Sequence, residues 1–299
     1  METGTVSLLF GTRKALPNGN MNTLTEGLSG GSPSTDLPKL VASDIGGTLV
    51  MGVGIIPSFT AAILNRLMEM DIPVALLTGY NYATVKGFTG NLDPKVLLMP
   101  QNGSLCIRDN EIVWEYRILE PEAEALYRYF HENDLPIIIY KGKNEDFKNY
   151  YVSREEQPLS YGFQRIDRLV NFEDITGIST LIPNPVVSEV KENIESIVGE
   201  KFKVIYSRGP NRSWLEVVHT AVRKDLALKR LCDEMRIPTG NVIYFGDNFN
   251  DLEVLRLVGH PVVVENAASE LKKEFFDIAG AVTREGVAHY LKLLYSLSF

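Results

Sequence analysis

Short apolar runs alternate with amphipathic stretches along most of the chain. The runs are three to five residues long, and the stretch Ser58–Met70 that follows the first run carries its apolar residues at helical spacing. The expected strands are Leu40–Ser43, Pro73–Leu77, Val96–Met99, Val242–Phe245 and Val262–Val264. Apolar runs separated by helices predict a parallel sheet that is covered on both faces.

The middle of the chain has a different pattern, in which strands outnumber helices. The expected helices are Glu122–Asn133 and Val186–Val198. The expected strands are Ile137–Tyr140, Tyr150–Val152, Ser179–Ile182, Phe202–Tyr206 and Trp214–Val218. Paired strands with few helices predict an α+β module inserted into the parallel-sheet domain. The expected fold class is therefore α/β, a doubly wound parallel sheet with a Rossmann-like core and an inserted α+β cap domain.

These patterns divide the chain into three parts. Residues 39–115 and 213–299 form the expected core domain, residues 116–212 the cap domain, and residues 1–38 an extension before the fold. Gly, Ser, Asn, Thr and Pro dominate the extension from Pro17 to Pro38, which is typical of a tail without regular structure. The alternative is an arm that docks on its own domain or on a second subunit.

Charge and composition narrow the function classes. A net charge of −8 argues against nucleic-acid and anionic-membrane partners. No apolar run reaches the ~18–20 residues that span a bilayer, and the N-terminus does not have the pattern of a signal peptide. The two cysteines, Cys106 and Cys232, suggest neither a metal site nor a disulfide framework. These features predict a cytoplasmic protein, and its oligomeric state stays open.

Two polar motifs directly follow expected strands. Asp44 comes after the first strand and opens a glycine-rich turn, where a carboxylate can act as nucleophile and metal ligand and backbone N–H groups can approach an anion. Thr78 and Gly79 follow the second strand and suit a phosphoryl oxygen. Taken singly, a strand-end turn and a hydroxyl-capped turn are the simpler explanations.

Two further motifs lie in the second half of the chain. Lys224 stands at the start of the expected helix Asp225–Met235, where a cation is unfavourable unless an anion lies nearby. Asp247, Asn248, Asn250 and Asp251 crowd behind a buried strand, and clustered carboxylates repel unless a cation neutralises them. A solvated lysine and an Asx-rich helix cap are the alternatives. The conjunction of all four motifs at expected strand and helix ends favours a binding site.

The four motifs resemble those of the haloacid dehalogenase superfamily of phosphohydrolases, in its Cof-type sugar-phosphatase branch with a large α+β cap. The resemblance covers residues 39–297. It also includes Gln101-Asn102-Gly103, Glu265-Asn266-Ala267 and Glu285-Gly286-Val287-Ala288. It implies a Mg²⁺-dependent phosphatase that acts on small phosphorylated metabolites, with sugar phosphates as the expected class.

The resemblance also implies roles for individual residues. Asp44 would be the nucleophile and form an aspartyl-phosphate. The implied Mg²⁺ ligands are Asp44, the carbonyl of Gly46, Asp247 and Asp251, of which Asp251 would hold a metal-bound water or orient Lys224. The implied phosphate-binding groups are Thr78, Lys224, Asn250 and the N–H groups around Ile45 and Gly79.

One position departs from the family pattern. Gly46 stands where the family has a second aspartate, which protonates the leaving oxygen and then activates water. Tyr80 also stands where the family often has arginine. Three explanations are compatible with Gly46: a slow phosphatase that uses water or another group as the acid, a non-catalytic binder of phosphorylated ligands, or an engineered substitution of the natural residue.

Substrate selection is expected from polar loops of the cap. The loop residues Arg208, Asn211 and Arg212 are the main candidates, because they precede the return of the chain to the core. Further candidates are Lys141, Lys143, Tyr151 and Arg154. A regulator that binds phosphorylated ligands is the second function class, and an assembly protein that uses the N-terminal arm is the third.

Overall fold

The computed structural model describes residues 37–52, 54–142, 149–152 and 163–298. The expected N-terminal extension therefore lies almost wholly outside the described residues. In the described ranges, no helix combines the length and the apolar character needed to cross a membrane.

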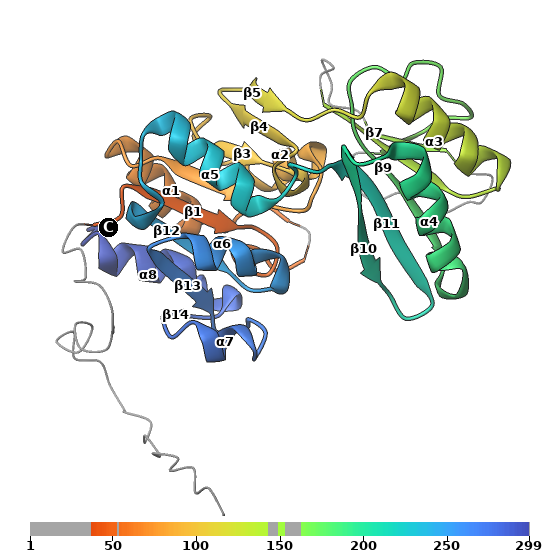
Figure 1. Ribbon diagram of the computed structural model, residues 1–299. Helices are drawn as coiled ribbons and strands as arrows, with labels where there is room; N and C mark the ends of the chain where they lie inside the picture. The colour runs from red at the N-terminus through yellow and green to blue at the C-terminus, as the bar shows by residue number, and fades with distance from the viewer. Residues whose placement is uncertain (1–36, 53, 143–148, 153–162, 299) are drawn as a thin grey trace, which may run out of the picture. The chain divides into compact units, whose positions relative to one another are not determined.

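An eight-stranded sheet, in the order β14-β13-β12-β1-β2-β3-β4-β5, forms the first domain (Figure 1). The strands from β14 to β3 pair in parallel, and β4 and β5 add an antiparallel hairpin. The strands are β1 (Leu40–Asp44), β2 (Val74–Leu77), β3 (Leu97–Met99), β4 (Leu105–Arg108), β5 (Glu111–Glu115), β12 (Val242–Gly246), β13 (His260–Val264) and β14 (Ile278–Ala279). Every residue of β1, β2 and β12 is buried, as expected for strands covered on both faces.

Helices cover this sheet, and the doubly wound prediction is confirmed (Figure 1). They are α1 (Ser58–Glu69), α2 (Tyr82–Phe88), α5 (Lys224–Met235), α6 (Leu252–Leu257), α7 (Leu271–Glu274) and α8 (Gly286–Leu294). Helix α1 packs beside α8, and α5 packs beside α6. Because Pro57 gives α1 no side-chain cap, Glu285 takes that part: its Oε2 accepts from the N–H and the hydroxyl of Thr60, both at 2.8 Å.

A six-stranded sheet, in the order β10-β11-β9-β6-β7-β8, belongs to the inserted part of the chain. Its strands are β6 (Ile137–Lys141), β7 (Asn149–Val152), β8 (Phe163–Arg165), β9 (Ile175–Pro183), β10 (Phe202–Arg208) and β11 (Arg212–His219). Helices α3 (Glu120–Glu132) and α4 (Val187–Val198) share an apolar core with one face of this sheet, which includes Ile139, Ile178 and Val217.

The end of the inserted part differs from the expected boundary at 212. Arg212 begins β11, and the residues up to His219 pair with β10 and β9 in the second sheet. The Gly209-Pro210 segment is a hairpin turn, in which the Gly209 N–H donates to the Arg212 carbonyl at 3.0 Å, and not a linker back to the first sheet. We therefore propose that the inserted domain ends near His219.

Candidate active site

Three neighbouring parallel strands bring the polar motifs to one edge of the first sheet. Asp44 is the last residue of β1, Thr78 follows β2, and Asp247 follows β12. The sheet order places β1 between β12 and β2, so the carboxyl ends of all three strands meet. Ligands of open α/β sheets bind at such an edge.

A pocket of about 290 Å³ opens at this edge. It is lined by Asp44, Gly46, Thr78, Gly79, Tyr80, Asp247, Asn248 and Asn250. Of the residues predicted from the sequence, Asp44, Gly46, Thr78, Gly79, Asp247 and Asn250 thus share one pocket. Ile45 is also predicted, and its side chain is fully buried, so only its backbone can serve a ligand.

Lys224 is the first residue of α5, and its almost fully buried side chain contacts the pocket residue Asp44. Its Nζ donates to Asp44 Oδ1 at 2.6 Å and to Asp251 Oδ1 at 2.8 Å. Burial by itself lowers the pKa of this ammonium, but the two carboxylates outweigh burial and raise the pKa above its ordinary value. Lys224 therefore carries a permanent positive charge next to Asp44.

Asp251 is fully buried and surrounded by hydrogen-bond donors. Its Oδ1 accepts from Lys224 and, at 2.7 Å, from the Tyr244 hydroxyl. Its Oδ2 accepts from the backbone N–H groups of Asp247 at 3.1 Å and Asn248 at 3.2 Å. An ionised carboxylate offers about four acceptor positions, and these donors occupy them. This geometry favours an orienting role toward Lys224, the second of the two roles that the resemblance implies.

Asp247 completes a cluster of acidic groups with Asp44 and Asp251. One carboxylate oxygen from each of the three lies within 4.8 Å of the others. Burial, and next the charge of Asp251, raise the pKa of Asp247 above its ordinary value, while a hydrogen bond from the Thr48 hydroxyl at 3.2 Å opposes this rise. The cluster therefore carries unfavourable negative charge that a hard cation would relieve.

Gly47 allows the turn to approach Asp247 closely. Its φ of +86° lies in the left-handed region, and a Cβ at this position would collide with the Asp247 carboxylate. The Gly47 carbonyl also accepts from the side-chain amide of Asn266 at 2.8 Å, which holds the turn in place.

Burial raises the pKa of Asp44 to about 7, and this rise persists although Lys224 opposes it. The charge of Asp251 adds to the effect of burial. The ionised form of Asp44 therefore depends on nearby positive charge, which Lys224 supplies only in part.

Several contributing residues were not assigned roles from the sequence. Tyr244 bonds to Asp251, Thr48 bonds to Asp247, and Asn266 holds the Gly47 turn. Thr48 follows the glycine-rich turn after Asp44, and Asn266 lies in the motif Glu265-Asn266-Ala267, so their places in the sequence could have indicated a role at the site. Tyr244 lies in an apolar strand run, and nothing in its sequence neighbourhood distinguishes it from a core residue.

Thr78 both lines the pocket and takes part in a hydroxyl-capped turn, the two possibilities that its sequence context left open. Its side chain lines the pocket, and its hydroxyl oxygen also accepts from the Tyr80 N–H at 3.3 Å, as in a hydroxyl-capped turn. The backbone at Thr78 is also held by a hydrogen bond, since the Asn102 N–H donates to the Thr78 carbonyl at 2.8 Å.

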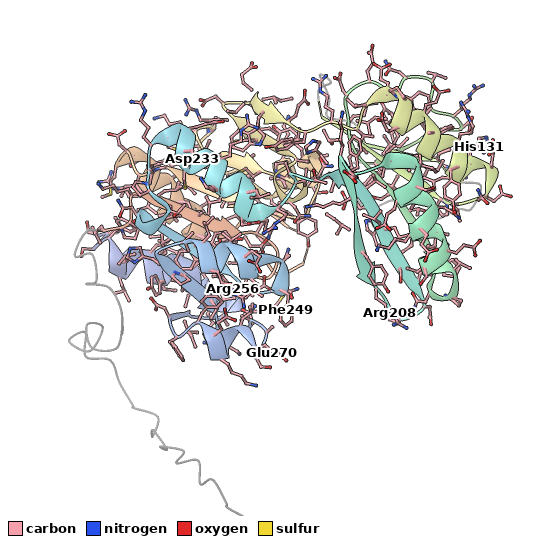
Figure 2. The ribbon with its side chains drawn as sticks, in the orientation of Figure 1. His131, Arg208, Asp233, Phe249, Arg256 and Glu270 are labelled. Atoms are coloured by element: carbon pink, nitrogen blue, oxygen red, sulfur yellow. The ribbon has the colours of Figure 1, made fainter. Side chains whose placement is uncertain are left out.

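The residues expected to select the substrate, Arg208, Asn211 and Arg212, do not line the pocket at Asp44. Arg208 and Asn211 are exposed, and Figure 2 shows Arg208 at the end of the β10–β11 hairpin. Arg212 lines a separate pocket of about 680 Å³ in the second domain, which also includes His131. None of these three lines the pocket at Asp44, and their role in substrate selection stays a prediction.

The other cap candidates add little to that prediction. The Lys141 Nζ donates to the carbonyl and the side-chain oxygen of Asn171, at 3.0 and 3.2 Å, so its ammonium group is already bound within the protein. Lys143, Arg154 and the side chain of Tyr151 lie outside the part of the chain that the structure describes.

Comparison with known proteins agrees with the geometry of this site. A model of haloacid dehalogenase-like hydrolases matches residues 41–291, which is most of the chain. The chain belongs to the haloacid dehalogenase-like hydrolase family. The resemblance inferred from the four motifs is thereby confirmed. The matched range begins in β1 and ends in α8, so it includes all strands of both sheets.

Relatives of this hydrolase are similar over nearly their whole length. A putative phosphatase of Haemophilus influenzae is 26% identical over 263 residues, which cover 85% of this chain and 97% of that protein. An HMP-PP phosphatase of Yersinia enterocolitica is 26% identical over 264 residues, which cover 85% and 94%.

Solved structures show the same fold. A haloacid dehalogenase-like hydrolase from Bacteroides thetaiotaomicron superposes with a TM-score of 0.73 at 21% identity, covering 86% of this chain and 99% of the other. A subclass IIB sugar phosphatase of the superfamily superposes with a TM-score of 0.61 at 17% identity, covering 87% and 100%.

Proposed function

We propose that this hydrolase is a Mg²⁺-dependent phosphatase of small phosphorylated metabolites, and that Asp44 attacks the phosphorus. Sugar phosphates are the first substrate class to test. The observation that supports this most is the buried contact of Lys224 with Asp44 at 2.6 Å, since Asp44 lines the same pocket as Thr78 and Asp247. A carboxylate at the end of a central strand, with a fixed cation beside it, is suited to attack a phosphate dianion.

The donor set fits Mg²⁺. Asp44 and Asp247 offer carboxylate oxygens, and Gly46, whose carbonyl is the third ligand that the resemblance implies, lines the same pocket. Hard cations prefer such oxygen ligands. Burial, and to a smaller extent the charge of Asp251, raise the pKa values of Asp44 and Asp247, so a cation in the pocket would favour their ionised forms. When bound, Mg²⁺ would neutralise charge on the transferring phosphoryl group. Asp251 would act indirectly, because it holds Lys224 and the N–H groups of the Asp247 turn.

The chain's own residues then have separate tasks in the reaction. The Asp44 carboxylate forms a bond to phosphorus while the bond from phosphorus to the leaving oxygen breaks, which gives an aspartyl-phosphate. Water attacks this phosphorus in the second step and releases phosphate and the Asp44 carboxylate. Lys224 holds Asp44 in place, and Thr78, Asn250 and the N–H groups of Ile45 and Gly79 bind phosphoryl oxygens.

A second candidate function is a sensor that binds phosphorylated ligands with little or no turnover. Gly46 favours this candidate, because positioned acid–base help is worth about 10²–10⁴-fold in rate and glycine has no side chain to provide it. Thermal stabilisation by a phosphorylated ligand without phosphate release would support the sensor.

The test is phosphate release from a panel of sugar phosphates and other phosphorylated metabolites, with and without Mg²⁺. The panel includes HMP-PP, the compound for which the Yersinia relatives are named. We expect Mg²⁺-dependent release that Asp44→Asn abolishes, together with hydroxylamine-sensitive transfer of phosphate to the unchanged protein. Asp233→Asn is the matched control, since Asp233 lies on the exposed side of α5 (Figure 2) and, among the residues that the structure describes, its carboxylate pairs with Lys229 alone. Release that survives Asp44→Asn would refute Asp44 as the nucleophile.

A further inference from the structure

The backbone at Gly46 would accept a side chain, but the space beside it is already filled. Its φ lies outside the left-handed region, in contrast to that of Gly47. A Cβ built on Gly46 would lie 2.8 Å from Cε2 of Tyr80, 3.2 Å from its hydroxyl oxygen and 3.4 Å from its Cζ. The Tyr80 ring therefore occupies the volume into which a side chain at position 46 would extend.

Tyr80 is held in this place by its surroundings. Its backbone N–H donates to the Thr78 hydroxyl oxygen, and its carbonyl accepts from the Gln101 N–H at 2.9 Å. Its ring meets the buried ring of Phe88 edge-on, with centroids 5.3 Å apart and an interplanar angle of 80°. Tyr80 also lines the pocket that contains Asp44. Within the described residues, no protein group makes a hydrogen bond with its hydroxyl, which is thus available to a ligand.

We propose that Tyr80 supplies the proton donor that position 46 lacks. This inference rests on the proposed phosphatase function. The hydroxyl lies next to the space that a carboxyl group at position 46 would occupy, and it reaches the same pocket from the neighbouring strand end. Gly46 and Tyr80 form a matched pair, because removing the side chain from one position makes room for the ring of the other.

The proposed proton path balances in both steps. In the first step the Tyr80 O–H proton passes to the leaving oxygen as its bond to phosphorus breaks and the bond from Asp44 to phosphorus forms. In the second step water attacks phosphorus, one water proton returns to the Tyr80 oxygen, and the Asp44–phosphorus bond breaks. Tyr80 therefore ends the cycle as it began.

This arrangement predicts that restoring an aspartate alone gives little gain. At 2.8 Å from Tyr80 Cε2, the Cβ of an aspartate at position 46 requires the ring to move, and Phe88 limits that movement. The carboxylate becomes useful only when Tyr80 is shortened at the same time. The informative variants are therefore Tyr80→Phe, Gly46→Asp, Tyr80→Ala and the double variant Gly46→Asp/Tyr80→Ala.

The experiment compares an alkyl phosphate, whose leaving group needs a proton, with an aryl phosphate whose leaving group does not. We expect Tyr80→Phe to lower kcat for the alkyl ester by about 10²-fold and to change kcat for the aryl ester by less than about threefold. We expect Gly46→Asp/Tyr80→Ala to exceed Tyr80→Ala on the alkyl ester by a similar factor. Tyr290→Phe is the control, because in the described part of the chain the Tyr290 hydroxyl bonds to Asp277 alone, and neither residue lines the pocket.

Equal losses on both esters, or no loss on either, would overturn the donor role of Tyr80. Gly46→Asp alone matching the double variant would overturn the steric pairing. Asp44→Asn distinguishes failure of this inference from failure of the proposed function. If Asp44→Asn abolishes turnover while Tyr80→Phe changes nothing, only the Tyr80 inference fails. If Asp44→Asn is silent, or the unchanged protein turns over neither ester, both fail.

Discussion

Removing the charge of Lys224 tests the electrostatic design of the site. The change Lys224→Met keeps most of the side-chain volume but leaves Asp44 and Asp251 without their shared partner at 2.6 and 2.8 Å. All three side chains are at most 5% exposed, so water cannot replace the ammonium. Removing one partner of a buried ion pair costs about 3–5 kcal/mol. We expect a loss in this range at neutral pH without added metal.

The measurement is urea unfolding followed by fluorescence or circular dichroism. With an m-value of about 2–3 kcal/mol/M, the midpoint should fall by about 1–2.5 M. Lys229→Met is the matched control on the same helix, since Lys229 and its partner Asp233 are 54% and 66% exposed. An exposed i,i+4 pair contributes only about 0.3–0.5 kcal/mol.

The pH dependence of the loss gives an independent check. In Lys224→Met the unpartnered carboxylates favour their protonated forms, so the folded variant binds more protons than the unfolded chain above the ordinary carboxyl pKa. Its stability then falls as pH rises through this window, and the difference from the unchanged protein should shrink on acidification. A loss equal to that of Lys229→Met, or a loss that grows on acidification, would refute the stabilisation of the buried Asp44 and Asp251 carboxylates by a charged Lys224.

Three further predictions concern the site and the inserted domain. Burial raises the pKa of Glu216 to about 7, so the folded protein loses stability as pH rises from the ordinary Glu pKa near 4.5 toward 7. This loss is at most about 3 kcal/mol. Glu216→Gln should remove it, which unfolding measured across this pH range would check. Gly47→Ala should destabilise the protein more than Gly52→Ala does, and it should also weaken Mg²⁺ binding measured by calorimetry. Both glycines have positive φ, but of these two only Gly47 faces the Asp247 carboxylate. Equal effects of the two variants would contradict that contact. Mg²⁺ at 100 times its Kd should stabilise the unchanged protein by about 2.7 kcal/mol, and Asp247→Asn should abolish the accompanying rise in Tm; a retained rise would exclude Asp247 as a ligand.

The local pattern predicted most elements of the fold. The strands β1, β2 and β12, and the Val262–Val264 part of β13, were recognisable because fully buried parallel strands are short and mostly apolar. The β4–β5 hairpin turns at Asp109-Asn110, a residue pair typical of two-residue hairpin turns, and both residues adopt the left-handed φ values, 53° and 62°, that such a turn requires. The short elements α2, α7, β8 and β14 were missed, because two to seven residues carry too little periodicity.

The expected boundary at 212 and the boundary that we propose near His219 differ for a physical reason. Glycine and proline mark both hairpin turns and interdomain linkers, and Gly209-Pro210 therefore had two possible meanings. Only the pairing of β11 with β9 and β10 distinguishes a turn inside the second sheet from the return to the first.

By itself, the sequence determined the order of strands and helices and the polar residues at their ends, since hydrophobic period and turn chemistry are local properties. The tertiary structure decided which residues meet. It joined Lys224 to Asp44 across 180 positions, saturated Asp251 with donors from β12 and α5, and filled the space beside Gly46 with the ring of Tyr80. Such contacts depend on strand order and side-chain packing between distant segments, and no local pattern encodes the distance between two atoms that far apart in the chain.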